Sequence, residues 1–210
     1  FVAGTMRNIF KYKSSEINYL KIGNGDEPLL AFHGFGENAF SFKSIAPSLG
    51  KRYTIYAFDF AYHGGTVWSE PDFFGKKDVV EIVSFFTAAN DISRFSVLGF
   101  SMGGKCALTT VEHFPERIND LFLMAADGIK TNRWFNLATY PSWGRAVFKM
   151  VIDRPGLLFF VLKCARKIRL VSKFLYQFTV NHMNTKEKRE RIYKTWMSLK
   201  DFQFNLDAIK

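Results

Sequence analysis

The chain has 210 residues, which is long enough to bury a sizeable core and suggests one domain with room for an insertion. Its 48% hydrophobic and 17% aromatic content is typical of a globular protein, and the apolar run 157–162 is far too short to span a bilayer. The two cysteines, Cys106 and Cys164, lack the spacing of a metal site, and so few cysteines are typical of a reducing cytoplasm.

Residues 1–128 alternate strand-like and helix-like segments. A hairpin over residues 6–22 precedes apolar strands near 28–32, 53–59, 95–100 and 120–126, and helices are expected at 39–49, 77–91 and 102–113. The run 121–126 is apolar on both faces, as expected of a central parallel strand. This alternation predicts an α/β fold, in which helices cover both faces of a mainly parallel sheet.

Residues 129–210 are predicted to form helices. From Leu157 onward, apolar residues at alternating spacings of four and three predict one basic amphipathic helix of about twenty residues, with lysines and arginines in the gaps. Thr185 is placed to cap a further helix. The formal net charge of +10 is concentrated here: residues 1–128 carry 12 Lys/Arg against 14 Asp/Glu, and residues 129–210 carry 17 against 5. We therefore expect a boundary near Gly128.

The most informative motif is Gly-Phe-Ser-Met-Gly at residues 99–103, which follows an apolar strand and opens a helix. A chain that reverses from strand to helix within a few residues strains the serine backbone and exposes its hydroxyl. Gly99 and Gly103 lack Cβ atoms, so the strand and the helix can close around the turn. The motif predicts a nucleophile elbow with Ser101 at its tip.

Two upstream loops complete a pattern that resembles the α/β-hydrolase family. His-Gly-Phe-Gly-Glu at 33–37 follows one strand, and Asp-Phe-Ala-Tyr-His-Gly at 59–64 follows the next. The resemblance covers roughly residues 6–128, with Tyr62 where the family often has glycine. It implies an α/β-hydrolase sheet with an α-helical cap, here residues 129–210.

The same resemblance assigns the parts of an acyl-transfer site. Ser101 is the expected nucleophile, and the backbone N–H groups of Phe35 and Met102 are the expected oxyanion donors. His33, Gly34, Gly99 and Gly103 belong to the supporting loops. Asp59 is expected to stabilise a turn. No metal or organic cofactor is implied.

The acid and the base of the triad are harder to place, because in this family they follow the serine in the order acid, then histidine. Asp127 is expected to be a turn aspartate that opens the cap, and the role of triad acid is the alternative. His33 and His63 belong to the loop motifs, His113 to a helix end, and His182 to a turn in the cap. We therefore expect the catalytic histidine, and the triad acid as well, beyond this sequence, on a chain that continues with two more strands; the alternative is a non-catalytic relative.

The predicted activity is cleavage of a carboxylic ester or related acyl bond through an acyl-enzyme on Ser101. A serine nucleophile argues against the dehalogenase and epoxide hydrolase branches, which use aspartate. A C–C bond hydrolase or a synthase on the same scaffold, or a binding protein without a base, are the alternatives. The aromatic-rich cap favours an apolar acyl or aromatic small-molecule substrate.

The basic second part has three interpretations. It is a plain solvated surface, or it attracts anionic substrates or a membrane surface, or it binds nucleic acid. No base-reading motif accompanies the charge, so no nucleic-acid partner is expected. The first five residues lack the basic and apolar pattern of a signal peptide, and we expect a cytoplasmic protein.

Overall fold

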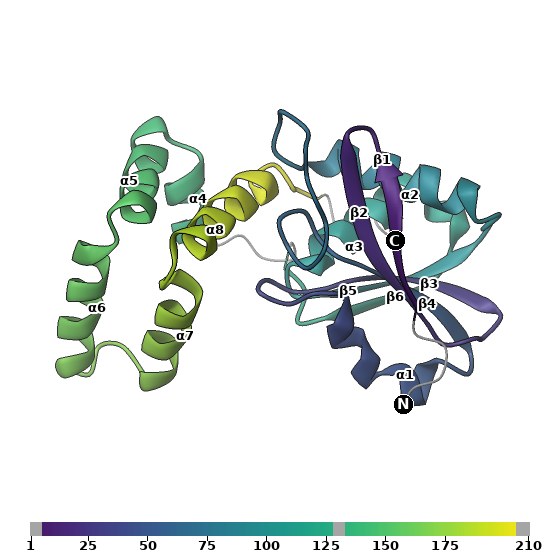
Figure 1. Ribbon diagram of the computed structural model, residues 1–210, viewed down its shortest axis with the longest axis horizontal. Coiled ribbons are helices and arrows are strands. Elements are labelled where there is room, and N and C mark those ends of the chain that lie inside the picture. The colour runs from purple at the N-terminus through teal and green to yellow at the C-terminus, as the bar shows by residue number, and fades with distance from the viewer. Residues whose placement is uncertain (1–5, 128–132, 205–210) are drawn as a thin grey trace. The chain divides into compact units, whose positions relative to one another are not determined.

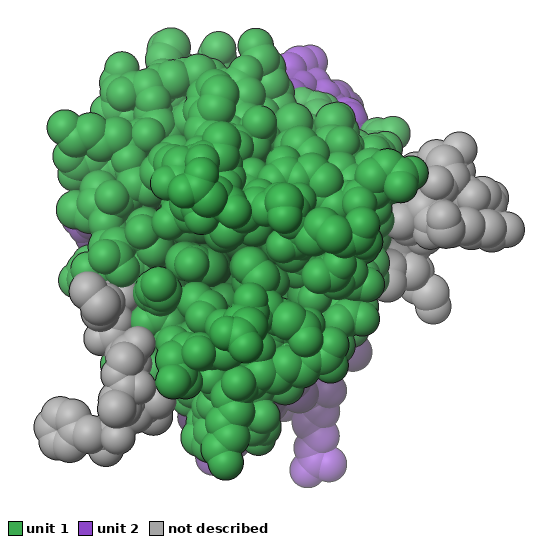
Figure 2. Space-filling view, turned by 90° about the vertical axis from the view of Figure 1, so that its right-hand side faces the viewer, with its two compact units in different colours: residues 1–131, 201–210 green, residues 132–200 purple. Residues whose placement is uncertain are grey.

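The computed structural model describes residues 6–127 and 133–204. The predicted boundary at Gly128 lies outside the described residues. The chain forms two compact units, an α/β core that contains residues 6–127 and 201–204 and a helical unit that contains residues 133–200 (Figures 1 and 2).

The α/β core is built on a six-stranded sheet with the order β1-β2-β4-β3-β5-β6 (Figure 1). The strands are β1 Met6–Tyr12, β2 Ser15–Ile22, β3 Glu27–Phe32, β4 Tyr53–Phe58, β5 Phe95–Phe100 and β6 Ile118–Met124. The hairpin β1–β2 pairs antiparallel, and β4, β3, β5 and β6 run parallel. The predicted α/β fold is confirmed, and the carboxyl ends of the four parallel strands meet at one edge.

Helices cover both faces of this sheet (Figure 1). One face packs on a 3-10 helix at Ala39–Ser44 and on α1, Ala46–Leu49. The other face packs on α2, Lys76–Ala89, and on α3, Gly103–His113. On that side the ring of Phe86, which is fully buried, makes edge contacts with Tyr19, Tyr56 and Phe58 at centroid distances of 5.0, 5.2 and 4.8 Å. The core therefore consists of two apolar layers that fix the strand ends.

Strand β6 lies at one end of the described sheet. Its Leu121, Phe122 and Leu123 are half-buried. Met124 at its end is 48% exposed.

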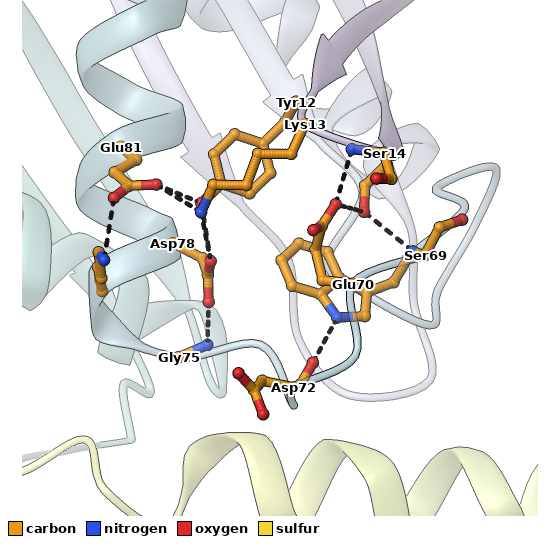
Figure 3. A network of polar contacts seen from close by, with 12 residues as sticks. Tyr12, Lys13, Ser14, Ser69, Glu70, Asp72, Gly75, Asp78 and Glu81 are labelled. Carbon is orange, nitrogen blue, oxygen red and sulfur yellow. Dashed lines mark hydrogen bonds and ion pairs between the residues drawn. The ribbon is translucent and has the colours of Figure 1, made fainter.

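A polar network fastens the opening hairpin to α2 (Figure 3). The Tyr12 hydroxyl lies 2.7 Å from Asp78 Oδ1 and 2.6 Å from Glu81 Oε2, and Lys13 Nζ lies 2.7 Å from the same Glu81 oxygen. Burial and these two carboxylates raise the pKa of Tyr12, so its hydroxyl stays protonated and donates. Hydrogen bonds from Lys13 and Tyr12 lower the pKa of Glu81 to about 2.

The helical unit contains α4 Arg133–Thr139, α5 Ser142–Asp153, α6 Gly156–Lys167, α7 Lys173–Met183 and α8 Lys186–Leu199. The Thr185 hydroxyl caps α8 by accepting a hydrogen bond from Lys188 N–H at 3.3 Å, as predicted. Phe148 and Trp196 pack at 5.1 Å, and α8 supplies most of the buried residues of this unit, namely Ile192, Thr195, Met197, Ser198 and Leu199.

The single amphipathic helix predicted from Leu157 is wrong, because the chain turns between α6 and α7. Arg169 has a φ of +61°, and the N–H groups of Arg169 and Leu170 donate to the carbonyls of Arg166 and Ala165 at 3.0 and 2.9 Å. This pair of bonds is a Schellman motif, which ends α6. Ser172 then accepts from Leu175 N–H at 3.1 Å and starts α7.

Candidate active site

Ser101 stands at the junction between β5 and α3 with a φ of +49°. Such a conformation is unfavourable for a residue with a Cβ and persists where the surroundings impose it. Here the Ser101 N–H donates to Met124 O at 2.9 Å, and its carbonyl accepts from the N–H groups of Gly104 and Asp127 at 2.9 and 2.8 Å. The predicted strained strand-to-helix turn is confirmed.

Two glycines allow α3 to begin directly against β3 and β5. A Cβ on Gly103 would lie 2.0 Å from Phe32 O, and a Cβ on Gly99 would lie 2.7 Å from Gly104 Cα. Sequence reasoning missed Gly104, where a Cβ would lie 2.5 Å from Ala126 Cβ. The Gly-Gly pair after the serine was the available signal for this second close approach.

The loop after β3 reaches the serine. A Cβ built on Gly34 would lie 3.3 Å from Ser101 Cβ and 2.9 Å from the Phe100 ring, so the loop backbone is in contact with the elbow. Phe35 follows directly, and Gly36 turns the chain with a φ of +79°. Met102, which is buried, is the N-cap of α3. The expected donors thus belong to two segments, Phe35 to the loop that contacts the elbow and Met102 to the start of α3.

His33 supports the site as a neutral ring. Its Nε2 accepts a hydrogen bond from Phe60 N–H at 2.9 Å, so the ring proton sits on Nδ1 and is donated to Gly34 O at 2.7 Å. Burial lowers the pKa of His33, which keeps this tautomer uncharged near neutral pH. The imidazole therefore ties the loop after β3 to the loop after β4.

Asp59 organises the loop after β4, as expected of a turn-stabilising residue. Its buried carboxylate accepts from Ala39 N–H at 2.7 Å, from Gly65 N–H at 2.6 Å and from the Asn18 side chain at 2.6 Å. Sequence reasoning missed Asn18, a buried amide from the opening hairpin. Tyr62, at a position where the family often has glycine, has a φ of +68°.

The remaining histidines lie at or near the predicted places, with one correction. His63 is buried in the loop after β4, with Nδ1 3.0 Å from Ala61 O and its ring 5.4 Å from that of Phe35. His113 ends α3, where its Nδ1 lies 2.9 Å from Thr109 O. His182 was predicted in a turn but lies inside α7, with its ring 4.2 Å from that of Phe178.

Asp127 follows β6, and its backbone N–H donates to Ser101 O in the elbow. Asp127 is itself exposed. Lys105, in the first turn of α3, is half-buried. Burial lowers the pKa of Lys105, and the charge of Asp127 opposes that shift. The two side chains thus bring opposite charges to one side of the turn. Within residues 6–127 and 133–204, no cluster of three or more His, Cys, Asp or Glu side chains could hold a metal ion.

Comparison with known proteins identifies the family. Residues 27–149 match the model of the alpha/beta hydrolase fold. The chain belongs to this family. A 2-hydroxy-6-oxo-6-(2'-aminophenyl)hexa-2,4-dienoic acid hydrolase of Metapseudomonas resinovorans is 29% identical over 117 residues, 54% of this chain and 40% of that protein. A serine hydrolase-like protein of Danio rerio is 24% identical over 188 residues, 87% of this chain and 57% of that protein.

Solved structures share the fold. A bacterial membrane phospholipase A superposes with a TM-score of 0.64 at 21% identity, over 98% of this chain and 66% of that one. The epoxide hydrolase CorEH superposes with a TM-score of 0.61 at 14% identity, over 95% of this chain and 76% of that one. The chain spans about two fifths of the length of the first curated relatives, with 38% of an uncharacterized Mycobacterium tuberculosis protein matched at 27% identity over 60% of this chain.

Proposed function

We propose that this protein is a serine hydrolase that cleaves a carboxylic ester or a related acyl bond through an acyl-enzyme on Ser101. The observation that carries the proposal is the left-handed backbone of Ser101 between β5 and α3, in contact with the loop of Gly34. Strain of about 1–3 kcal/mol at a non-glycine residue is typical of functional sites. Hydrolase-named relatives support the same class of reaction.

In this proposal, Ser101 Oγ attacks the acyl carbon, and its proton passes to a general base. The negative charge that develops on the acyl oxygen is stabilised by the N–H groups of Met102 and Phe35, and the first of these lies at the positive end of α3. Collapse of the intermediate expels the alcohol, which takes up the proton. Water then attacks the acyl-enzyme by the same route and releases the acid.

The general base is assigned to a histidine outside residues 6–127. His33 is excluded because both of its ring nitrogens are taken up by backbone groups. His63 is excluded because its ring is buried in the loop after β4, with Nδ1 3.0 Å from Ala61 O. His113 lies at the far end of α3, about 15 Å from Ser101 along the helix axis at ~1.5 Å per residue. His182 is the histidine within residues 133–204, and His182→Ala tests it directly. We expect this variant to keep its activity.

Asp127, which is expected to be a plain turn aspartate, is also the candidate for the acid partner of that base. Its backbone is already fixed next to Ser101, and its side chain is exposed at the carboxyl end of β6. Asp127→Asn separates the two roles. A loss of kcat of about 10⁴-fold, the size seen when a triad acid becomes an amide, supports the acid, and an unchanged kcat supports the turn residue.

The test of the proposed activity uses the full-length protein and a short-chain aryl ester. Ser101→Ala is expected to abolish turnover, and the control Ser48→Ala, which changes an exposed serine on α1, is expected to leave it unchanged. Far-UV circular dichroism checks that both variants fold. Turnover of the ester by Ser101→Ala at the wild-type rate would contradict the proposal.

A C–C bond hydrolase is the second candidate, and the Metapseudomonas resinovorans relative favours it. Both reactions would use Ser101 and the same oxyanion donors, so the substrate distinguishes them. Turnover of a 2-hydroxy-6-oxo-dienoic acid with a kcat/KM well above that for aryl esters would assign the C–C reaction. The reverse order would assign the ester.

A further inference from the structure

The turn between α6 and α7 carries the most exposed apolar side chains of the helical unit. Leu170 and Phe174 are each 77% exposed, and Ile168 is 67% exposed. Isolated apolar residues on a surface are ordinary, but these three lie within seven consecutive positions. Figure 1 shows this turn joining α6 and α7 at their common end. We call residues 167–175 the apolar tip.

The exposed apolar surface continues along α6. One side of this helix, with Leu158, Phe159, Leu162 and Ala165, is half-buried. The opposite side is also apolar but exposed: it presents Leu157, Phe160, Val161 and Cys164. These four residues recur at spacings of three and one, as one face of a helix requires, and Ile168 extends the same stripe into the tip. Helix α6 thus has a second apolar face that the described chain leaves in solvent.

The charged residues of the segment that contains this face are all basic. Residues 154–186 contain seven lysines and arginines and no aspartate or glutamate. Within the apolar tip, Lys167, Arg169 and Lys173 alternate with the exposed Ile168, Leu170 and Phe174, and all three cations are exposed. Long basic side chains can place their charged ends beside an apolar surface while their methylene stems lie along it.

We propose that the apolar tip and the exposed face of α6 dock on the surface of an anionic phospholipid bilayer. Leucine, isoleucine and phenylalanine side chains would enter the boundary between headgroups and acyl chains, and the three cations of the tip would pair with lipid phosphates and carboxylates. No helix in residues 6–127 or 133–204 is long and apolar enough to cross a membrane, so the contact is interfacial.

The charge and the apolar surface together favour an anionic bilayer over a second copy of the chain and over nucleic acid. A second copy of the chain would bring seven like charges of residues 154–186 against seven more, which opposes association through this face. Nucleic acid would satisfy the cations but not the exposed aliphatic side chains between them. An anionic bilayer satisfies both, because it offers negative headgroups above an apolar interior.

The test is co-sedimentation of the full-length protein with phosphatidylcholine vesicles that contain either no phosphatidylserine or about 30 mol% of it, an anionic fraction that gives a strongly negative surface. We expect binding to the anionic vesicles, weak binding to the neutral ones, and a steep loss of binding as salt is raised. Each basic residue near the surface contributes about a 5-fold change in partitioning, so Lys167→Gln with Lys173→Gln should weaken binding by roughly 30-fold. Leu170→Ser with Phe174→Ser should remove binding to both vesicles.

Matched controls separate this role from general effects of positive charge and surface hydrophobicity on vesicle binding. Lys11→Gln with Lys51→Gln removes two exposed cations of the α/β core, and Val147→Ser removes a half-exposed apolar side chain of α5. Both controls should bind like the wild type. Equal weakening by controls and tip variants would overturn the proposal, and so would absence of binding to anionic vesicles at low salt. Light scattering that shows a dimer broken by Leu170→Ser, without vesicle binding, would assign the face to self-association instead.

Discussion

The close approach of α3 to β3 makes a quantitative prediction for Gly103→Ala. The added Cβ would lie 2.0 Å from Phe32 O and 2.4 Å from Phe32 C, and 2.8 Å from His33 O. An ordinary contact needs about 3.4 Å or more, so the helix start must move by more than about 1 Å against backbone that no rotamer change can displace. Overpacking of this kind destabilises by about 1–3 kcal/mol, and we expect the upper end, about 3 kcal/mol.

The matched control is Gly156→Ala, which also changes the first residue of a helix. Nothing lies within 4 Å of a Cβ built on Gly156, so alanine is expected to stabilise α6 by about 0.4–1 kcal/mol. Urea unfolding of the full-length protein, followed by circular dichroism, measures both. For a chain of this size ~3 kcal/mol lowers Tm by about 6–12 °C. A Gly103→Ala variant within about 0.5 kcal/mol of the wild type would refute the described packing of the elbow.

Three further predictions concern the loops and the hairpin. Because burial lowers the pKa of His33, the unfolded chain binds a proton near pH 6.5 that the folded chain does not. The free energy of unfolding should therefore fall as pH drops below about 6.5. In urea titrations at several pH values, His33→Gln should flatten that slope. Tyr12→Phe removes the hydroxyl between Asp78 and Glu81 and should lower the free energy of unfolding by about 1.5–3 kcal/mol, measured by thermal unfolding. The stability that Glu81 contributes should be full above about pH 4.5 and disappear as pH falls towards about 2. A wild-type stability profile that is flat over that pH window would contradict the network. Asp59→Asn places an amide where three N–H donors converge and should cost a similar ~1.5–3 kcal/mol, whereas an equal Tm would show that the carboxylate is dispensable.

The parts of the fold that short sequence motifs determine could be predicted from the sequence. Gly-x-Ser-x-Gly between a strand and a helix imposes its turn within five residues, and the φ of Ser101 follows from that. The approach of Gly34 to the elbow also follows, since β3 and β5 are adjacent parallel strands whose carboxyl ends meet. The contribution of Asn18 was not readable, because its partner Asp59 lies 41 residues away and a lone asparagine in a strand carries no signal.

The break between α6 and α7 shows a different limit. The four-and-three spacing continues through Ile168, Val171 and Leu175, so the periodicity alone describes one helix. The Schellman motif that ends α6 usually has glycine at its left-handed position, and here that position holds Arg169. Hydrogen bonds to two carbonyls of α6, together with the cap supplied by Ser172, form the turn without the residue that normally marks it.

The most direct measurement of the central claim is labelling of the full-length protein with a fluorophosphonate probe, followed by mass spectrometry of the modified peptide. An activated serine beside oxyanion donors reacts with such a probe, whereas an ordinary surface hydroxyl does not. We expect a single adduct on Ser101, absent in Ser101→Ala and retained in Ser48→Ala. An adduct on another residue, or none on Ser101 in folded protein, would contradict the assignment of Ser101 as the nucleophile.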